Sequence, residues 1–89
     1  MSYLAIARVG AGGSWAREET ADKAVMRVAS IVVEDWGSLY ALEGEEIDVA
    51  LYNVGDRPTA SRRGMVTDAE SGEEIECTEV RSITLRKRR

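Results

Sequence analysis

The residues that most resemble a ligand-binding loop are the glycines of GAGGSWAREET, residues 10–20, which fall between an apolar run and a helical pattern. Loops of this kind can hold a phosphate with their backbone N–H groups. A Walker loop has the pattern G-x-x-x-x-G-K-[ST], but this segment contains no lysine. A dinucleotide loop has the pattern G-x-G-x-x-G, but counting from Gly10 its third glycine position holds Trp15. The segment therefore matches neither phosphate-binding motif.

The charges around this segment also disfavour a phosphate site. Glu18 and Glu19 precede the predicted helix, where their negative charge would repel an anion from the helix N-terminus. Arg8 and Arg17 flank the segment and are the cationic side chains that an anionic ligand would meet there. We interpret residues 10–20 as a flexible connection whose glycines allow the chain to turn sharply after a strand.

A second group of candidate residues is basic and could contact phosphates. It comprises Arg62 and Arg63 in a predicted loop and the C-terminal run Arg86, Lys87, Arg88 and Arg89. Binding of this kind releases counterions and weakens as salt is added. Residues 1–85, however, carry 8 of the 12 basic and all 16 acidic side chains, a formal charge of −8 that would oppose a polyanion. A nucleic-acid accessory protein is therefore the alternative function.

The residue types and their spacing give little support for metal binding or catalysis. Two acidic clusters, at residues 43–48 and 68–74, raise the question of a calcium loop, but counting from Asp68 the required sixth-position glycine falls at the fifth, Gly72. We interpret both clusters as solvated turns and expect neither a metal nor a cofactor. The chain has no histidine, and its lone Cys77 lies in a predicted strand, where we expect a buried, inert thiol. We assign no catalytic residue and do not expect an enzyme.

Length and composition indicate a small folded protein. With 89 residues, 44% of them hydrophobic, the chain fits a single domain over residues 1–85 followed by a basic tail, residues 86–89. The sequence shows neither a membrane-spanning run nor a signal peptide, and one cysteine allows no internal disulfide, so we expect a soluble cytoplasmic protein. The acidic, lysine-poor composition fits a salt-rich cytoplasm, but a bias in genomic base composition would also give many arginines and alanines.

The periodicity of apolar residues predicts one helix and several strands. We expect a strand at Tyr3–Val9, a helix from Thr20 to about Trp36 that stops at Gly37, a strand at Glu45–Val54 and a loop at Gly55–Gly64. Beyond them we expect a hairpin with arms Met65–Asp68 and Glu74–Val80, a turn at Ala69–Gly72, a bulge or bend near Val80–Ser82 and a final stretch at Ile83–Leu85. This order, β-α-β-β-β, predicts an α+β fold with one helix on a small, mostly antiparallel sheet. The alternative is a small β-barrel of the last four strands, with the first strand and helix added.

The predicted helix has an unusually wide apolar surface. One face of Ala21, Ala24, Val25, Val28, Ile31 and Val32 suits a sheet, and a second face of Met26, Ala29, Val33 and Trp36 lies beside it. Either another part of this short chain or another copy must cover the second face. We therefore expect a non-enzymatic module that acts through protein association, as a homodimer whose interface contains Met26, Val33, Trp36 and Tyr40.

Overall fold

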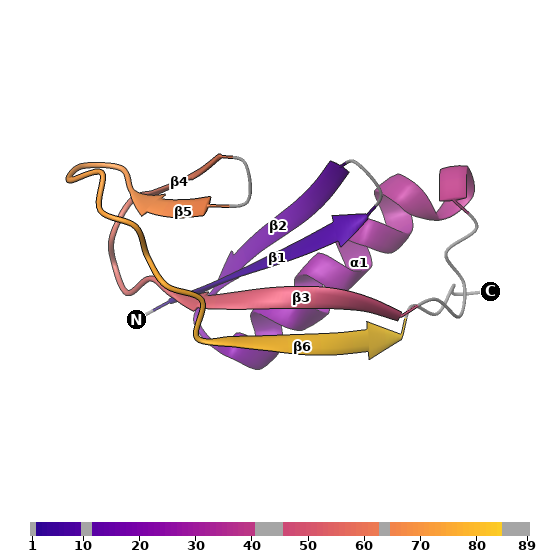
Figure 1. Ribbon diagram of the computed structural model, residues 1–89. Coiled ribbons are helices and arrows are strands. Elements are labelled where there is room, and N and C mark those ends of the chain that lie inside the picture. Colours follow the sequence, from indigo (N-terminus) through magenta and orange to yellow (C-terminus); the bar gives the residue numbers. More distant parts are fainter. Residues whose placement is uncertain (1, 10–11, 41–45, 63–64, 85–89) are drawn as a thin grey trace.

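The computed structural model describes residues 2–9, 12–40, 46–62 and 65–84. These residues form one long helix and six strands (Figure 1). In chain order they are β1 (Tyr3–Val9), β2 (Gly12–Glu18), α1 (Ala21–Tyr40), β3 (Glu46–Asn53), β4 (Thr59–Arg62), β5 (Met65–Asp68) and β6 (Glu79–Thr84).

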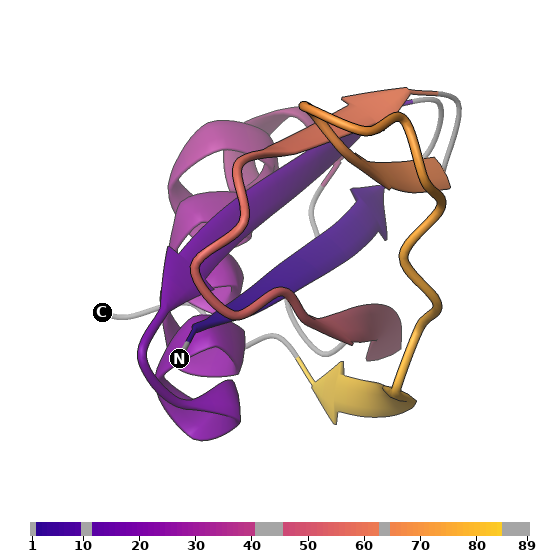
Figure 2. The ribbon, with the colours of Figure 1, turned by 90° about the vertical axis from the view of Figure 1, so that its left-hand side faces the viewer.

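The strands divide into two sheets. Four of them form an antiparallel sheet in the order β2-β1-β3-β6, and β4 pairs with β5 in a separate two-stranded sheet. Helix α1 lies on one side of the larger sheet, at the left of Figure 2, and the β4–β5 hairpin lies on the other side, at the upper right. The predicted α+β class is confirmed. The barrel alternative is wrong, because the last four strands do not belong to one sheet.

The segment interpreted as a flexible connection contains a strand. Gly12–Glu18 forms β2, which pairs with the whole of β1 from Val9 opposite Gly12 to Tyr3 opposite Glu18. Two residues separate the ends of these strands, which is the commonest length for a hairpin connection. Gly12 and Gly13 therefore belong to a strand that pairs with β1, and β1 is an interior strand between β2 and β3, which accounts for its two mostly apolar faces.

Helix α1 begins where the sequence predicts. The Thr20 hydroxyl accepts a hydrogen bond from the Lys23 N–H at 3.2 Å, which satisfies one of the unpaired donors of the first turn. The predicted stop at Gly37 is wrong, because the helix continues to Tyr40. A glycine costs only about 1 kcal/mol relative to alanine inside a helix, which favourable contacts elsewhere can outweigh. Among the residues that the structure describes, no helix is long and apolar enough to cross a membrane.

The main core lies between α1 and the sheet. Its members are Ala5, Ala7, Ala16, Ala24, Val25, Val28, Val32, Ile47, Val49 and Leu51, all with little or no exposure. The helix packs chiefly over β1 and β2, whose buried side chains on this side are the small Ala5, Ala7, Ser14 and Ala16. Small side chains let the helix backbone approach those strands closely, and the larger Val49 and Leu51 of β3 complete the core beside it.

A second core lies under the β4–β5 hairpin on the opposite side of the sheet. It contains Leu4 and Tyr52 from the sheet, Val54 after β3, and Val66 and Ile75 from the hairpin region. The hairpin thus covers only one end of this side, since Leu4 and Tyr52 are neighbours at that end of β1 and β3. No other helix or strand that the structure describes lies over the rest of this side of the sheet (Figure 2).

The chain between β3 and β6 differs from the predicted pattern. The predicted loop over residues 55–64 contains β4, which pairs with β5. The second arm of the predicted hairpin is reduced to a bridge between Thr67 and Glu74. The predicted bulge near residues 80–82 is also wrong, because β6 pairs with β3 without interruption. Thr78 directly precedes β6, and its N–H and hydroxyl both donate to the Leu51 carbonyl, at 2.8 and 2.9 Å.

Candidate association surfaces

An apolar row crosses the open side of the sheet. The strand registers place Trp15 of β2 opposite Ile6 of β1, Ile6 opposite Ala50 of β3, and Ala50 opposite Val80 of β6. Directly opposite residues of an antiparallel sheet point to the same side, so these four side chains form one continuous line across all four strands. We call them the cross-sheet row.

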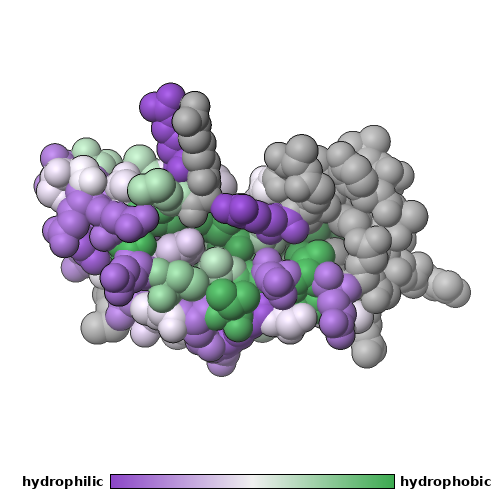
Figure 3. Space-filling model, in the orientation of Figure 1, coloured by the Kyte–Doolittle hydropathy of each residue, from purple (hydrophilic) through white to green (hydrophobic). Residues whose placement is uncertain are grey.

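The ends of the cross-sheet row are exposed and its middle is partly covered. Trp15 keeps 65% and Val80 60% of their surface exposed, whereas Ile6 and Ala50 pack in part against the second core. Figure 3 looks onto this side of the sheet and shows hydrophobic atoms in its middle with hydrophilic groups around them. The row is therefore an apolar strip on the solvent side of the sheet.

The charged residues beside the cross-sheet row are basic on β1 and β2 and acidic on β3. Arg8 lies two residues beyond Ile6 on the same side of β1, and Arg17 lies two residues from Trp15 on the same side of β2. On β3 the corresponding position beyond Ala50 is Asp48, which is exposed like Arg8. An exposed indole between two arginines thus faces solvent at one edge of the sheet.

Arg17 has a structural role that the sequence did not reveal. Its Nε donates to the Ser2 hydroxyl at 2.9 Å, and its terminal nitrogen donates to the Gly55 carbonyl at 3.1 Å. The Ser2 carbonyl in turn accepts the N–H groups of Val54 and Gly55, at 3.1 and 3.2 Å. Arg17 therefore fastens β2 to the start of β1 and the end of β3, and two of its donor groups are already used.

The helix residues predicted for an interface are in different environments. Met26 is 71% exposed on the outer side of α1, in the position that the sequence predicts. Val33 is partly buried and packs against the main core. Trp36 and Tyr40 belong to α1, but their side chains lie outside the described part of the structure. Of the four, Met26 is the one described as a freely exposed apolar side chain.

The structure describes little of the predicted basic surface. Arg62 is the last residue of β4 and its side chain is exposed. Arg63 and the run Arg86, Lys87, Arg88 and Arg89 lie outside the described residues.

The structure explains the acidic cluster at residues 68–74 as a turn. The Asp68 carboxylate accepts the N–H groups of Glu70 and Ser71, at 2.8 and 3.2 Å, and these hydrogen bonds lower the pKa of Asp68. Such a side-chain cap is characteristic of aspartate at the start of a turn. Across residues 2–9, 12–40, 46–62 and 65–84, no three His, Cys, Asp or Glu side chains are close enough together to hold a metal ion.

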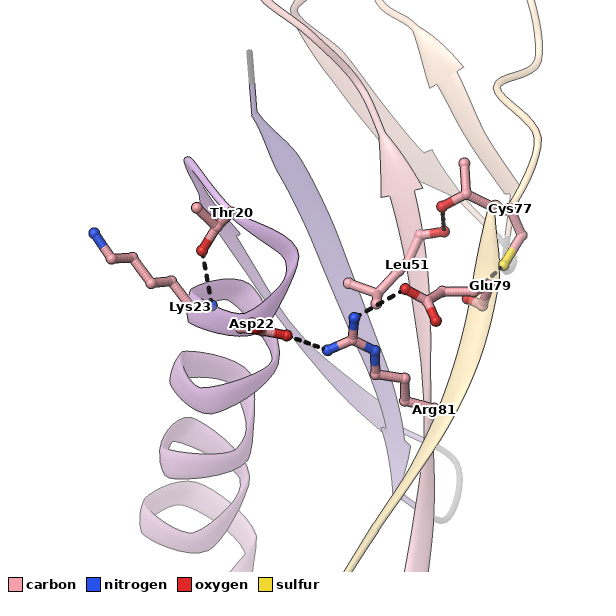
Figure 4. A network of polar contacts seen from close by, with 8 residues as sticks. Thr20, Asp22, Lys23, Leu51, Cys77, Glu79 and Arg81 are labelled. Carbon is pink, nitrogen blue, oxygen red and sulfur yellow. Dashed lines mark hydrogen bonds and ion pairs between the residues drawn. The ribbon is translucent and has the colours of Figure 1, made fainter.

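A polar network joins β6 to the start of the helix (Figure 4). The Arg81 guanidinium donates to Asp22 of α1 at 2.6 Å and to Glu79 at 3.0 Å, and both bonds raise the pKa of Arg81. Cys77 is exposed and lies outside the strands, so the expectation of a buried thiol in a strand is wrong. Its Sγ donates to the Glu79 carbonyl at 3.2 Å. These contacts hold the edge strand in place.

No protein-family model matches the chain, and searches of curated proteins and of solved structures find no similar protein. Function is therefore inferred from the surfaces of the chain itself.

Proposed function

We propose that this protein is a non-enzymatic module that acts through protein association and forms a homodimer. The observation that supports the proposal is the cross-sheet row, in which an exposed tryptophan and an exposed valine flank two partly covered apolar residues. Apolar surface of this kind, bordered by polar groups, is characteristic of protein interaction sites. Because closed homodimers are the commonest soluble oligomers, a second copy is the first partner to consider.

The sheet side is a better candidate than the helix side predicted from the sequence. Val33 is partly used by the main core, so the described part of the helix offers chiefly Met26. The sheet side offers the exposed Trp15, and aromatic residues are enriched where proteins bind one another. The proposed interface therefore contains Trp15, with Met26 outside it.

Solution mass tests the proposal. We expect the purified chain to elute as a dimer by light scattering coupled to size-exclusion chromatography. Trp15→Glu should give a folded monomer, because a carboxylate cannot be buried there without a partner. Met26→Glu is the matched control on the opposite side and should stay a dimer; circular dichroism checks that both variants fold. A monomeric wild type at every concentration would reject the homodimer, and dissociation by Met26→Glu alone would move the interface to the helix.

A second candidate function, nucleic-acid binding, is favoured by the place of Trp15 between Arg8 and Arg17. Exposed aromatic rings beside guanidinium groups can stack on the bases of a single strand. The acidic body and the prior engagement of Arg17 weigh against this function. If it holds, a single-stranded oligonucleotide should bind at low salt and be released by added salt, and Trp15→Ala and deletion of residues 86–89 should each weaken the binding. Absence of binding at low salt would reject it.

We also propose a reducing, salt-rich cytoplasm as the working environment. An exposed Cys77 persists as a thiol most easily in a reducing compartment, and the many exposed carboxylates suit high salt. Unfolding in urea should then require more denaturant as potassium chloride rises to molar levels. A midpoint that falls or stays constant would contradict the salt-rich part, and a disulfide-linked protein isolated from its host would contradict the reducing part.

A further inference from the structure

Strand β2 leaves one long edge of the main sheet open. It is the first strand in the order β2-β1-β3-β6, and its contacts are chiefly with β1 and α1 (Figure 1). No other segment that the structure describes pairs with its outer side. In an antiparallel strand every second residue directs its N–H and C=O away from the neighbouring strand, so within the described residues the outer side of β2 presents backbone groups that no other strand pairs.

The two edges of the sheet differ in protection. Natural edge strands are commonly shielded from pairing by charged side chains, proline or bulges. The other edge, β6, carries Glu79 and Arg81, which are tied to each other and to Asp22. The five residues Gly12–Ala16 of β2 have no charge and no proline, and its charges are confined to Arg17 and Glu18 at one end. Strand β2 is therefore the unshielded edge.

Strand β2 can pair with a second copy of itself along its whole length without bringing like charges together. Trp15 is the middle of its seven residues, so a two-fold axis through Trp15 pairs the full strand with a second copy. This register puts Gly13 opposite Arg17 and Gly12 opposite Glu18, and it keeps like charges apart. A two-residue slip leaves two residues of each strand unpaired. A four-residue slip leaves four residues of each strand unpaired, and in one direction it also puts Arg17 opposite its own copy. The register centred on Trp15 makes the most backbone pairs.

We infer that β2 pairs antiparallel with β2 of a second copy in this register. The inference rests on the proposed homodimer and specifies its geometry. Two four-stranded sheets become one sheet of eight strands. Directly opposite residues point to the same side of a sheet, so pairing Trp15 with Trp15 puts both helices on the same side. Since α1 packs over β1 and β2, the two helices approach each other above the joined edge. The two cross-sheet rows meet end to end at the paired Trp15 side chains, which lose the exposure they have in the single chain.

Disulfide trapping tests the register. Directly opposite residues have Cα atoms about 4.5–5.5 Å apart, within the range of roughly 4.4–6.8 Å that a disulfide spans. In a Cys77→Ser background, Trp15→Cys should therefore form an intermolecular disulfide under mild oxidation. Val80→Cys is the matched control, because Val80 is as exposed as Trp15 but lies on the other edge. Arg17→Cys is the register control, because its two copies would be roughly 13 Å apart along the strand, too far to bridge.

Cross-linking of Trp15→Cys without cross-linking of either control supports the inference. A dimer in which Trp15→Cys does not cross-link with itself, or in which a mixed disulfide joins Trp15→Cys to Val80→Cys, overturns this geometry but leaves the homodimer standing. A monomeric wild type overturns both. Hydrogen exchange on the wild type guards against a substitution that weakens the dimer itself. All β2 amides should be protected in the dimer, and continued fast exchange at alternate positions would overturn the pairing.

Discussion

Gly13 of β2 lies against the backbone carbonyl of Ala7, and a Cβ placed on Gly13 would come within 2.9 Å of that oxygen. Real Cβ atoms essentially never approach backbone this closely, so the position requires glycine in the observed structure. Part of the glycine-rich segment is thus explained by the pairing of β1 with β2. No phosphate or other ligand is needed to account for Gly13.

Replacing Gly13 by alanine should therefore destabilise the protein. Because the obstacle is backbone, β2 must shift away from β1, and overpacking of this kind costs about 1–3 kcal/mol. Urea unfolding followed by circular dichroism measures the free-energy change. Ser82→Ala, at an exposed position of β6, is the control and should change the free energy of unfolding little. Equal stability of Gly13→Ala and wild type would show that the strands are not held this closely.

Removing the Thr20 hydroxyl should weaken the start of α1. Thr20→Ala deletes the acceptor of the Lys23 N–H, and loss of such a cap costs about 0.5–2 kcal/mol. Thr20→Ser keeps the hydroxyl and should retain most of the stability. Thermal unfolding of the three proteins measures the difference. If serine and alanine were equally destabilising, the hydroxyl would not be the cause.

The ion pair between Arg81 and Asp22 should contribute only a small, salt-dependent stability. The pair joins residues far apart in sequence at 2.6 Å, but Asp22 is largely exposed, and exposed pairs are strongly screened by solvent. A double-mutant cycle with Arg81→Met and Asp22→Asn should give a favourable coupling at low salt that shrinks as salt is added. A coupling unchanged by salt would contradict the electrostatic origin of the contact.

The fold was predictable where the apolar periodicity was strong. The apolar residues of α1 at helical spacing and the alternation in β3 gave elements close to those observed. Strand β2 was missed because its inward residues are the small Ser14 and Ala16, which give little hydrophobic signal. The available clue was the two-residue connection between Val9 and Gly12, which suits a hairpin.

The candidate site was less predictable than the fold. The exposure of Met26 followed from its position on the helix, but the cross-sheet row joins four strands and depends on three strand registers. Nothing in the local sequence aligns Trp15 with Val80, which is 65 residues further along the chain. Likewise, the Arg17 contacts with Ser2 and Gly55 exist only because β1 brings the ends of β2 and β3 together.

Tyr52 should make stability sensitive to alkaline pH. Burial raises the pKa of its phenol above the ordinary value of about 10, negative charge at Cys77 and Glu74 acts in the same direction, and Arg8 opposes it. Because the folded state favours the protonated phenol, the stabilising contribution is full below the unfolded pKa and is lost as pH rises through the higher folded pKa. Tyr52→Phe removes this titration. The free energy of unfolding should therefore fall less steeply above pH 10 in the variant than in wild type, as urea unfolding at several pH values would measure. Parallel pH dependence of the two proteins would show that the phenol is not buried as the second core requires.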